Sequence, residues 1–508
     1  MADTLTTTAP NTHDPLDRLV SWHASWRGLR TLVLGLGVTG FAAADTLAEL
    51  GADVLVAAEH AEAGRRQMLD AIGARLLETE LRAVPGEVRR FAPEVIIASP
   101  GFHPDHALLS WAGHAGIPVW GDIELAWRLR DKTGRPADWL AVTGTDGKTT
   151  TVQLSAEILR QAGLRVAPCG NIGVPVLDAI RDPQGFDVLV VELSSYQLHW
   201  TNRNAAGALS PYASVCLNIA PDHLDWHGSF ENYRAAKARV YENTRVACVY
   251  NKADEATVAM VREAEVVAGA RAIGFGRGAP GPGDLGVVGG VLCDRAFLDD
   301  RAERALELTT LDELAGRGLA APHLVEDVLA AAALTRSYGV APEVIHEALT
   351  HFTVDQHRVE TVAVRGGTRW VDDSKATNPH AAAAALTAFP RIVWLVGGAV
   401  KGVDVGPLVE KFAPRLRAAV ILGADRAAFR AAFRRHAPQL PVFEIQAADT
   451  EEIMRQAVEY AAGKAGPGDT VLLAPAAAST DQFANYAQRG SMFAAAVRAL
   501  PAAERPAE

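Results

Sequence analysis

A glycine-rich loop, Gly-Thr-Asp-Gly-Lys-Thr-Thr at residues 144–150, constrains this chain more than any other stretch. The apolar run from Trp139 to Val142 predicts a strand before the loop, and the run from Thr150 to Gln161 predicts a helix after it. A strand, loop and helix of this kind surround an anion with backbone N–H groups and a helix N-terminus. Lys148 adds a positive charge for nucleotide phosphates, and Thr149 adds a hydroxyl that can reach Mg²⁺. The loop is a short variant of G-x-x-x-x-G-K-[ST], because Val142 stands at the position of the first Gly.

Length and composition indicate a folded protein of several domains. A chain of 508 residues predicts about three domains at about 150 residues each. Hydrophobic residues make up 49% and charged residues 21%, which excludes a disordered chain. The net charge of −11, without a Lys/Arg cluster, argues against a nucleic-acid partner. The four scattered cysteines lack C-x-x-C spacing, so we expect reduced core residues rather than disulfides or a zinc site.

The N-terminal residues predict no targeting segment. Met1 to Pro15 is polar and has no apolar core, unlike a signal peptide or a membrane anchor. No apolar run reaches the length of about 18 residues that a membrane span needs. We therefore expect a soluble cytoplasmic protein without a membrane partner, in which residues 1–27 are flexible.

The first region has the pattern of a dinucleotide-type fold. A strand at Thr31–Leu34 leads into G-x-G-x-x-G at Gly35–Gly40, and a helical run follows to Leu50. A second strand, Asp53–Ala58, ends at Glu59, where such folds hold the acid that contacts a ribose. Strands and helices alternate to the polar stretch at residues 130–137, which predicts a doubly wound α/β domain over residues 1–136.

The central region places polar residues after predicted strands. The strand Asp187–Val191 ends at Glu192, and the strand Ser214–Ile219 leads to Asp222 and His223. A carboxylate at the carboxyl end of a parallel strand lies where α/β sheets bind ligands, and beside a phosphate loop it suits Mg²⁺. His223 fits either a site residue or a hydrogen-bonded turn histidine.

The next helix and the last region complete the pattern. Ser229 can N-cap a helix that carries Lys237, whose periodicity alone would make it a solvated lysine. Residues 274–290 are rich in Gly and predict hairpins or a loop. Further alternating strands and helices predict another α/β domain over residues 355–508, which leaves residues 137–354 as the central domain.

The motifs together resemble the Mur ligases of peptidoglycan synthesis, most closely the members that add D-glutamate. The resemblance covers nearly the whole chain after about residue 28. Its motifs are Gly35–Gly40, Ser99–Gly101, Gly121–Leu125, Thr143–Thr150, Gly170–Gly173, Glu192–Leu198, Asn218–His223, Tyr233–Lys237, His357–Arg358, Asp373–Asn378 and Asp481–Gly490.

The resemblance implies an α/β fold of three domains. These are an N-terminal Rossmann-like UDP-binding domain (1–136), a central P-loop-type ATPase domain with a mostly parallel sheet (137–354), and a C-terminal Rossmann-like domain that binds the amino acid (355–508). It implies that ATP phosphorylates the carboxylate of UDP-N-acetylmuramoyl-L-alanine and that the amine of D-glutamate then displaces the phosphate. Such phosphoryl transfer depends on cations and positioned donors.

The resemblance also assigns residues. Catalytic roles fall on Lys148, Lys237, His223 and Glu192. ATP contacts fall on Gly144, Thr145, Asp146, Gly147, Lys148, Thr149, Thr150, Arg358 and Asp373. UDP-substrate contacts fall on Gly37, Val38, Thr39, Glu59, Ser99, Gly101, Asn171 and Ser194. The D-glutamate pocket falls on Lys375, Thr377, Lys401, Ser479 and Tyr486. The ligands of two Mg²⁺ ions fall on Thr149, Glu192, His223 and Lys237, the last as a carbamate, and a monomer is expected.

Four positions depart from the family pattern. Asp146 replaces the usual Asn of the phosphate loop, Leu324 follows His323 in place of Asn, Ala474 replaces a common Ser, and Glu59 stands where Asp is commoner.

Other functions compete with this interpretation. Folylpolyglutamate synthetases share the phosphate loop but lack the N-terminal G-x-G-x-x-G region. Another Mur ligase fits less well at Asp373–Asn378 and Asp481–Gly490. An NAD-dependent oxidoreductase leaves the second glycine-rich loop unexplained, and a non-catalytic nucleotide switch leaves the lysines of the glutamate pocket unexplained.

Overall fold

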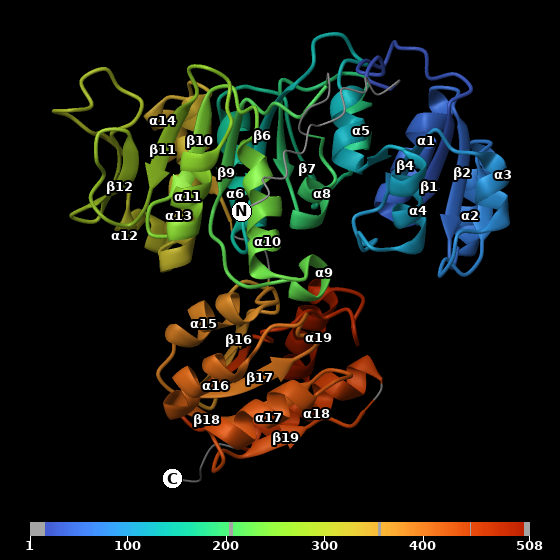
Figure 1. Ribbon diagram of the computed structural model, residues 1–508. Coiled ribbons are helices and arrows are strands. Elements are labelled where there is room, and N and C mark those ends of the chain that lie inside the picture. Colours follow the sequence, from blue (N-terminus) through green and yellow to red (C-terminus); the bar gives the residue numbers. More distant parts are fainter. Residues whose placement is uncertain (1–15, 203–206, 354–356, 448, 502–508) are drawn as a thin grey trace, which may run out of the picture. The chain divides into compact units, whose positions relative to one another are not determined.

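The computed structural model describes residues 16–202, 207–353, 357–447 and 449–501, coloured along the chain in Figure 1. They form two compact units, one from residues up to 219 with 234–352, the other from residues 220–233 with those from 353 onward. The expected domain boundary at residue 354 lies outside the described residues. The segment 220–233, expected in the central domain, packs with the second unit because Gly402 lies against Asp225 there.

The start of the chain differs from the expected flexible segment where it is described. The expectation for residues 1–15 lies outside the described residues. Leu16, Leu19 and Trp26 are buried. The side chain of Arg128 donates hydrogen bonds to the carbonyls of Leu16 and Leu19 at 3.3 and 3.2 Å. The buried apolar side chains and these hydrogen bonds hold residues 16–27 in place within the first unit.

Among residues 16–128, a five-stranded parallel sheet has the order β3-β2-β1-β4-β5 (Figure 1). Its strands are β1 (Arg30–Leu34), β2 (Asp53–Ala58), β3 (Arg75–Glu78), β4 (Val95–Ala98) and β5 (Val119–Trp120). Its helices are α1 (Val38–Glu49), α2 (Ala63–Ala71), α3 (Gly86–Phe91), α4 (Ala107–Ala115) and α5 (Asp122–Arg128). The chain order reverses between β1 and β4, which is where open α/β sheets bind ligands.

Alternation along the strands gives this sheet two apolar faces. Val33 and Val56 join a core that includes α1, whereas Leu34 and Leu55 join a second core with α3 and α4. Successive side chains of a strand point to opposite faces, so a strand covered on both sides is apolar throughout. The doubly wound arrangement predicted from the sequence is confirmed for this sheet.

In the described part of residues 138–310, a nine-stranded sheet has the order β14-β13-β12-β11-β10-β9-β6-β8-β7. Its strands are β6 (Asp138–Thr143), β7 (Val166–Gly170), β8 (Val188–Glu192), β9 (Ala213–Cys216), β10 (Ala247–Asn251), β11 (Arg271–Phe275), β12 (Asp284–Val288), β13 (Val291–Asp294) and β14 (Leu306–Thr310). The pairs from β7 to β12 are parallel, and β12, β13 and β14 pair antiparallel. Residues 274–290, for which hairpins or a loop were expected, contain β12, and this strand forms an antiparallel hairpin with β13 directly after the stretch.

Helices flank this sheet, and α6 and α13 pack together beside it. They are α6 (Lys148–Gln161), α7 (Val176–Ile180), α8 (Ser195–His199), α10 (Phe230–Ala238), the 3₁₀ helix η1 (Arg239–Tyr241), α11 (Glu255–Glu263), α12 (Leu311–Gly316), α13 (Pro322–Ser337) and α14 (Pro342–His351). Pro322 and Pro342 begin their helices at the position where a missing N–H costs no helical bond. The strand expected to reach Ile219 ends at Cys216, because Asn218 hydrogen bonds the phosphate loop instead.

The described residues of the second unit form a six-stranded sheet with the order β15-β16-β20-β17-β18-β19. Its strands are β15 (Glu360–Arg365), β16 (Thr368–Asp372), β17 (Ile392–Gly397), β18 (Leu416–Leu422), β19 (Val442–Glu444) and β20 (Thr470–Leu473). Its helices are α9 (Leu224–His227), α15 (Pro379–Thr387), α16 (Gly406–Phe412), η2 (Ala413–Arg415), α17 (Ala427–His436), α18 (Thr450–Ala462) and α19 (Tyr486–Ala499). Trp394 and Val393 belong to cores on opposite faces, so this sheet is also doubly wound. None of the helices in the described parts of the chain is long and apolar enough to cross a membrane.

Candidate active site

The phosphate loop joins β6 to α6, and two of its glycines have positive φ. Gly147 precedes α6 with φ +84°, and a Cβ there would lie 2.1 Å from Oδ1 of Asp327 on α13. Gly144 has φ +151°, and a Cβ there would lie 3.0 Å from Cβ of Leu217. Only glycine fits these conformations at such close approach. The backbone of the loop is therefore held tightly between the β9 end and α13.

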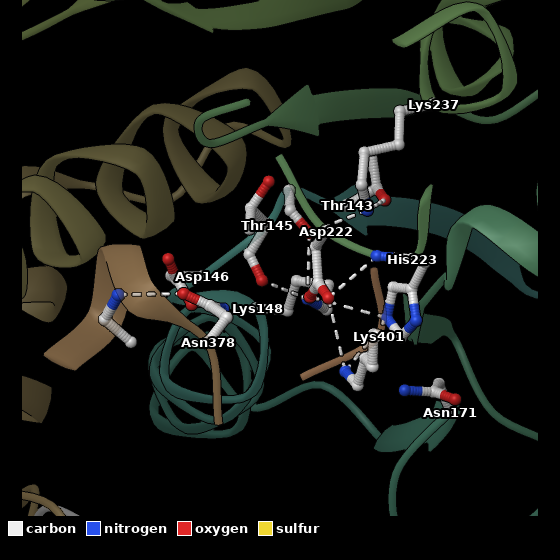
Figure 2. Close-up of polar contacts among 12 residues, drawn as sticks. Thr143, Thr145, Asp146, Lys148, Asn171, Asp222, His223, Lys237, Asn378 and Lys401 are labelled. Carbon is white, nitrogen blue, oxygen red and sulfur yellow. Dashed lines mark hydrogen bonds and ion pairs between the residues drawn. The ribbon is translucent and has the colours of Figure 1, made fainter. Parts of the chain in front are cut away.

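Two lysines from different elements meet at this loop. Nζ of Lys148 donates to the carbonyls of Gly144 and Thr145, both at 2.8 Å. Nζ of Lys237 donates to the same Gly144 carbonyl at 2.7 Å and to Oγ1 of Thr143 at 3.3 Å (Figure 2). The interpretation of Lys237 as a solvated lysine is wrong, because it is only 2% exposed. Two ammonium groups thus concentrate positive charge where the loop would receive phosphate.

Glu192 ends β8 and joins two other predicted residues. Its Oε2 accepts a hydrogen bond from Oγ1 of Thr149 and its Oε1 accepts one from Nδ2 of Asn171, both at 3.0 Å. The side chain is buried. Parallel strands bring the ends of β6 and β8 to one edge of the sheet, which explains why residues far apart in sequence meet here. A buried carboxylate beside a hydroxyl is an oxygen donor set that suits Mg²⁺.

Ser194 begins α8 with a capping box. Its Oγ accepts from the backbone N–H of Gln197 at 3.1 Å, and Oε1 of Gln197 accepts from the backbone N–H of Ser194 at 3.0 Å. Such reciprocal bonds satisfy two amides at the helix start that would otherwise lack partners. The cap holds Ser194 two residues from Glu192.

Six of the residues predicted to hold the UDP-substrate lie at one edge of the five-stranded sheet, whereas Asn171 and Ser194 follow strands of the nine-stranded sheet. Gly37 is the N-cap of α1, with Val38 and Thr39 in its first turn, at the end of β1. A Cβ on Gly40 would lie 2.1 Å from the Gly35 carbonyl, so the turn requires glycine. The other predicted contacts follow β2 and β4 and are Glu59, Ser99 and Gly101. These positions surround the β1/β4 switch point.

In the second unit, Lys401 meets two residues of the segment 220–233. Its Nζ lies 3.3 Å from Oδ1 of Asp222 and 3.4 Å from Nε2 of His223 (Figure 2). The backbone N–H of His223 donates to Asp222 Oδ1 at 2.9 Å. His223 and Lys401 have positive φ values of 52° each, an uncommon conformation for residues with a Cβ. Backbone strain held in place by surrounding contacts is typical of functional sites.

A buried arginine connects two loops that carry predicted glutamate-pocket residues. Nε and Nη2 of Arg489 donate to Oγ and the carbonyl of Ser374 at 3.0 and 2.8 Å, and Nη1 donates to the Ala477 carbonyl at 3.3 Å. Burial lowers the pKa of Arg489 to about 10. These bonds tie the loop that carries Lys375 and Thr377 to the loop that carries Ser479. Nζ of Lys375 lies 5.1 Å from the centre of the Tyr486 ring.

The predicted ATP contacts of the second unit lie next to a buried pair. Asp373 Oδ1 accepts from the backbone N–H of Val359, the neighbour of Arg358, at 3.3 Å. Nδ1 of His357 lies 2.6 Å from Oδ2 of Asp372. Burial raises the pKa of Asp372, and the hydrogen bond from His357 opposes this rise.

Sequence reasoning gave no role to two residues that contact the phosphate loop. Nδ2 and Oδ1 of Asn218 bond the carbonyl and the N–H of Asp146 at 3.2 and 2.8 Å. Asp327 lies beside Gly147, and its Oδ1 accepts from Oγ1 of Thr151 at 3.5 Å. The sequence offered little signal for Asp327, because it is one of two adjacent acidic residues, Glu326 and Asp327, within α13.

Comparisons with known proteins agree with this geometry. Residues 142–282 match the Mur ligase middle domain, and residues 357–477 match the Mur ligase glutamate ligase domain. A protein of Leifsonia xyli named UDP-N-acetylmuramoylalanine–D-glutamate ligase is 65% identical over 489 residues, which are 95% of each chain. A Streptomyces coelicolor protein of the same name is 51% identical over 480 residues, covering 94% of this chain and all of its own.

A solved structure shows the same fold. The UDP-N-acetylmuramate–alanine ligase of Thermotoga maritima superimposes with a TM-score of 0.53 at 18% identity, covering 92% of this chain and 99% of its own. From the two domain matches and the relatives that are similar over nearly their whole length, it follows that the chain belongs to the Mur ligase family of ATP-dependent ligases.

Proposed function

We propose that this chain uses ATP to join D-glutamate to UDP-N-acetylmuramoyl-L-alanine, the reaction in the name of its relatives. A carboxylate oxygen of the UDP-substrate attacks the γ-phosphorus of ATP, and ADP leaves. The amine of D-glutamate then attacks the acyl carbon, phosphate leaves, and the nitrogen loses a proton as the amide forms. The observation that carries the proposal is the meeting of Lys148, Thr149 and Glu192 at the phosphate loop. Both steps move negative charge between oxygens, and fixed cations stabilise that charge.

We assign nucleotide binding to the loop itself. Lys148 bonds the loop carbonyls, and a bound phosphate would offer it a better acceptor at the same place. The residues assigned to the nucleotide are Gly144, Thr145, Asp146, Gly147, Lys148, Thr149 and Thr150, with Arg358 and Asp373 of the last domain.

We also propose that the protein uses two Mg²⁺ ions. The residues assigned to them are Thr149 and Glu192, whose side chains meet beside the loop, together with His223 and a carbamylated Lys237. When bound, Mg²⁺ neutralises phosphate charge. Lys148 and Lys237 both donate to the carbonyl of Gly144, so two like charges lie close together. Carbamylation of Lys237 replaces that repulsion by attraction and supplies the missing anionic oxygens.

We assign the amino acid to the last domain. Lys375 and Lys401 provide two cations for the two carboxylates of glutamate, and Thr377, Ser479 and Tyr486 provide polar contacts. Lys401 already pairs with one carboxylate, that of Asp222, so its ammonium is placed to bind the kind of group that glutamate carries. The UDP-substrate is assigned to Gly37, Val38, Thr39, Glu59, Ser99, Gly101, Asn171 and Ser194. We propose that the protein acts as a cytoplasmic monomer.

Phosphate release tests the proposal directly. Purified protein with ATP, Mg²⁺ and UDP-N-acetylmuramoyl-L-alanine should release phosphate with D-Glu, and much less with L-Glu, D-Ala or L-Lys. The variant Lys148→Ala, once circular dichroism shows that it is folded, is the matched control for ATPase activity from contaminating proteins. Turnover that prefers another amino acid, or a folate acceptor in place of the UDP-substrate, would reject the proposal.

A further inference from the structure

Helix α5, which follows the first sheet, contacts the capping box of α8. Asp122, at the first position of α5, is 4% exposed, and its Oδ2 accepts a hydrogen bond from Nε2 of Gln197 at 2.9 Å. The two residues are 75 positions apart in sequence. Gln197 is equally buried, so this bond is shielded from water. A buried bond to a carboxylate contributes more than an exposed bond between neutral groups.

The carboxylate of Asp122 determines which way the Gln197 amide points. An ionised carboxylate only accepts hydrogen bonds, so the NH₂ group of Gln197 must face it. Oε1 of the same amide is then directed to Ser194, where it accepts from the backbone N–H at 3.0 Å and from Oγ at 3.1 Å. The direction of the Ser194 O–H is thereby fixed from another part of the fold.

Two further contacts hold α8 and its following residues against α5. A Cβ on Gly121 would lie 3.0 Å from Cβ of Trp200, so glycine permits this close approach. Oε2 of Glu124 accepts from the backbone N–H of Asn202 at 3.0 Å. Glu124 is itself paired with Arg128 at 2.8 Å, and both side chains are fully buried. The residues 121–128 therefore form a rigid support for the helix that Ser194 begins.

We infer that Asp122 is a positioning residue for the UDP-substrate, acting through Gln197 on the hydroxyl of Ser194. This inference rests on the proposed role of Ser194 as a substrate contact. Asp122 itself touches no reacting group. Asp122 orients the amide of Gln197, and this amide orients the hydroxyl of Ser194, so α5 is linked to the start of α8.

Exchange of donor and acceptor between the two side chains tests this. Gln197→Glu removes the NH₂ donor and places two carboxyl groups opposite each other, which repel when both are ionised at pH 9, although an oxygen still faces Ser194. The KM for the UDP-substrate should rise about tenfold or more, and the KM for ATP should change less than twofold. The double variant Asp122→Asn/Gln197→Glu restores one donor and one acceptor, and its KM should return to within about threefold of wild type. Glu87→Ala, in the first turn of α3 and exposed, is the control.

The outcomes separate the two claims. Wild-type protein without D-glutamate-dependent turnover would overturn the proposed function, and this inference with it. Normal wild-type turnover with an unchanged KM in Gln197→Glu, or with no recovery in the double variant, would overturn only the inference. If Gln197→Glu does not fold, Gln197→Ala and Asp122→Ala/Gln197→Ala replace it. Their KM values should then be equal, because Asp122 acts only through Gln197, and a further rise in the double variant would reject the inference.

Discussion

Asp122→Asn should change how the stability of the protein depends on pH. Burial raises the pKa of Asp122 from its ordinary value of 3.8 to about 6, although the hydrogen bond from Gln197 and the N–H groups at the start of α5 oppose the rise. The folded state therefore holds the proton more tightly than the unfolded state. Asparagine keeps an oxygen acceptor for Gln197 but carries no charge at any pH.

The size of the effect follows from the two pKa values. At 1.36 kcal/mol per pKa unit, the difference between 3.8 and about 6 corresponds to about 3 kcal/mol. Below pH 3.8 the carboxyl is protonated in both states and costs nothing. Between pH 3.8 and about 6 the carboxyl ionises in the unfolded state while the folded state keeps its proton, so the wild type progressively loses about 3 kcal/mol relative to Asp122→Asn. The amide group of Asn can also change the free energy of unfolding, but this contribution does not depend on pH and so does not alter the predicted trend.

Urea unfolding of both proteins between pH 4 and pH 8, followed by tryptophan fluorescence, measures this difference. The free energy of unfolding of Asp122→Asn relative to wild type should increase across this range and level off above about pH 7. Glu87→Gln, at an exposed position in α3, is the matched control for the loss of one carboxylate. A difference that does not change with pH would show that Asp122 is not desolvated as described.

Other substitutions test the proposed site. Lys148→Ala should lower ATP turnover by about 10²-fold or more in phosphate-release assays without loss of the fold, because the ammonium stabilises phosphate charge. Lys401→Ala should raise the KM for D-Glu about tenfold while the KM for the UDP-substrate stays nearly constant, and an equal rise in both would exclude it from the amino-acid pocket. Lys237→Ala should be nearly inactive and partly restored by added acetate, and an active variant would reject the carbamate. Gly147→Ala should raise the KM for ATP, because its Cβ would overlap Asp327; an unchanged KM would show that the loop adapts.

The local pattern of the sequence was sufficient for most elements. The predicted strand Asp53–Ala58 has the observed bounds of β2. Continuous apolar runs between glycine turns identify strands that are buried on both faces. The sequence also predicted the phosphate loop, because the strand, the glycine with positive φ and the start of the helix follow one another along the chain.

Contacts between segments that lie far apart in the sequence could not be predicted in this way. The spacing of residues 230–238 predicts a helix but not which side of it is buried, and Lys237 lies inside because the end of β6 offers it Thr143 and Gly144. Asp327 likewise meets Gly147 only because α13 packs on α6.

The sequence alone determined the alternation of strands and helices, the two glycine-rich turns and the kinds of side chain at the strand ends, because these depend on neighbours along the chain. The tertiary structure decided that residues 220–233 pack with the second unit, that Lys401 pairs with Asp222, and that Asp122 orients Gln197. Each of these contacts joins residues tens of positions or more apart. Their partners are chosen by which elements bury their apolar faces together, and no local pattern encodes that choice.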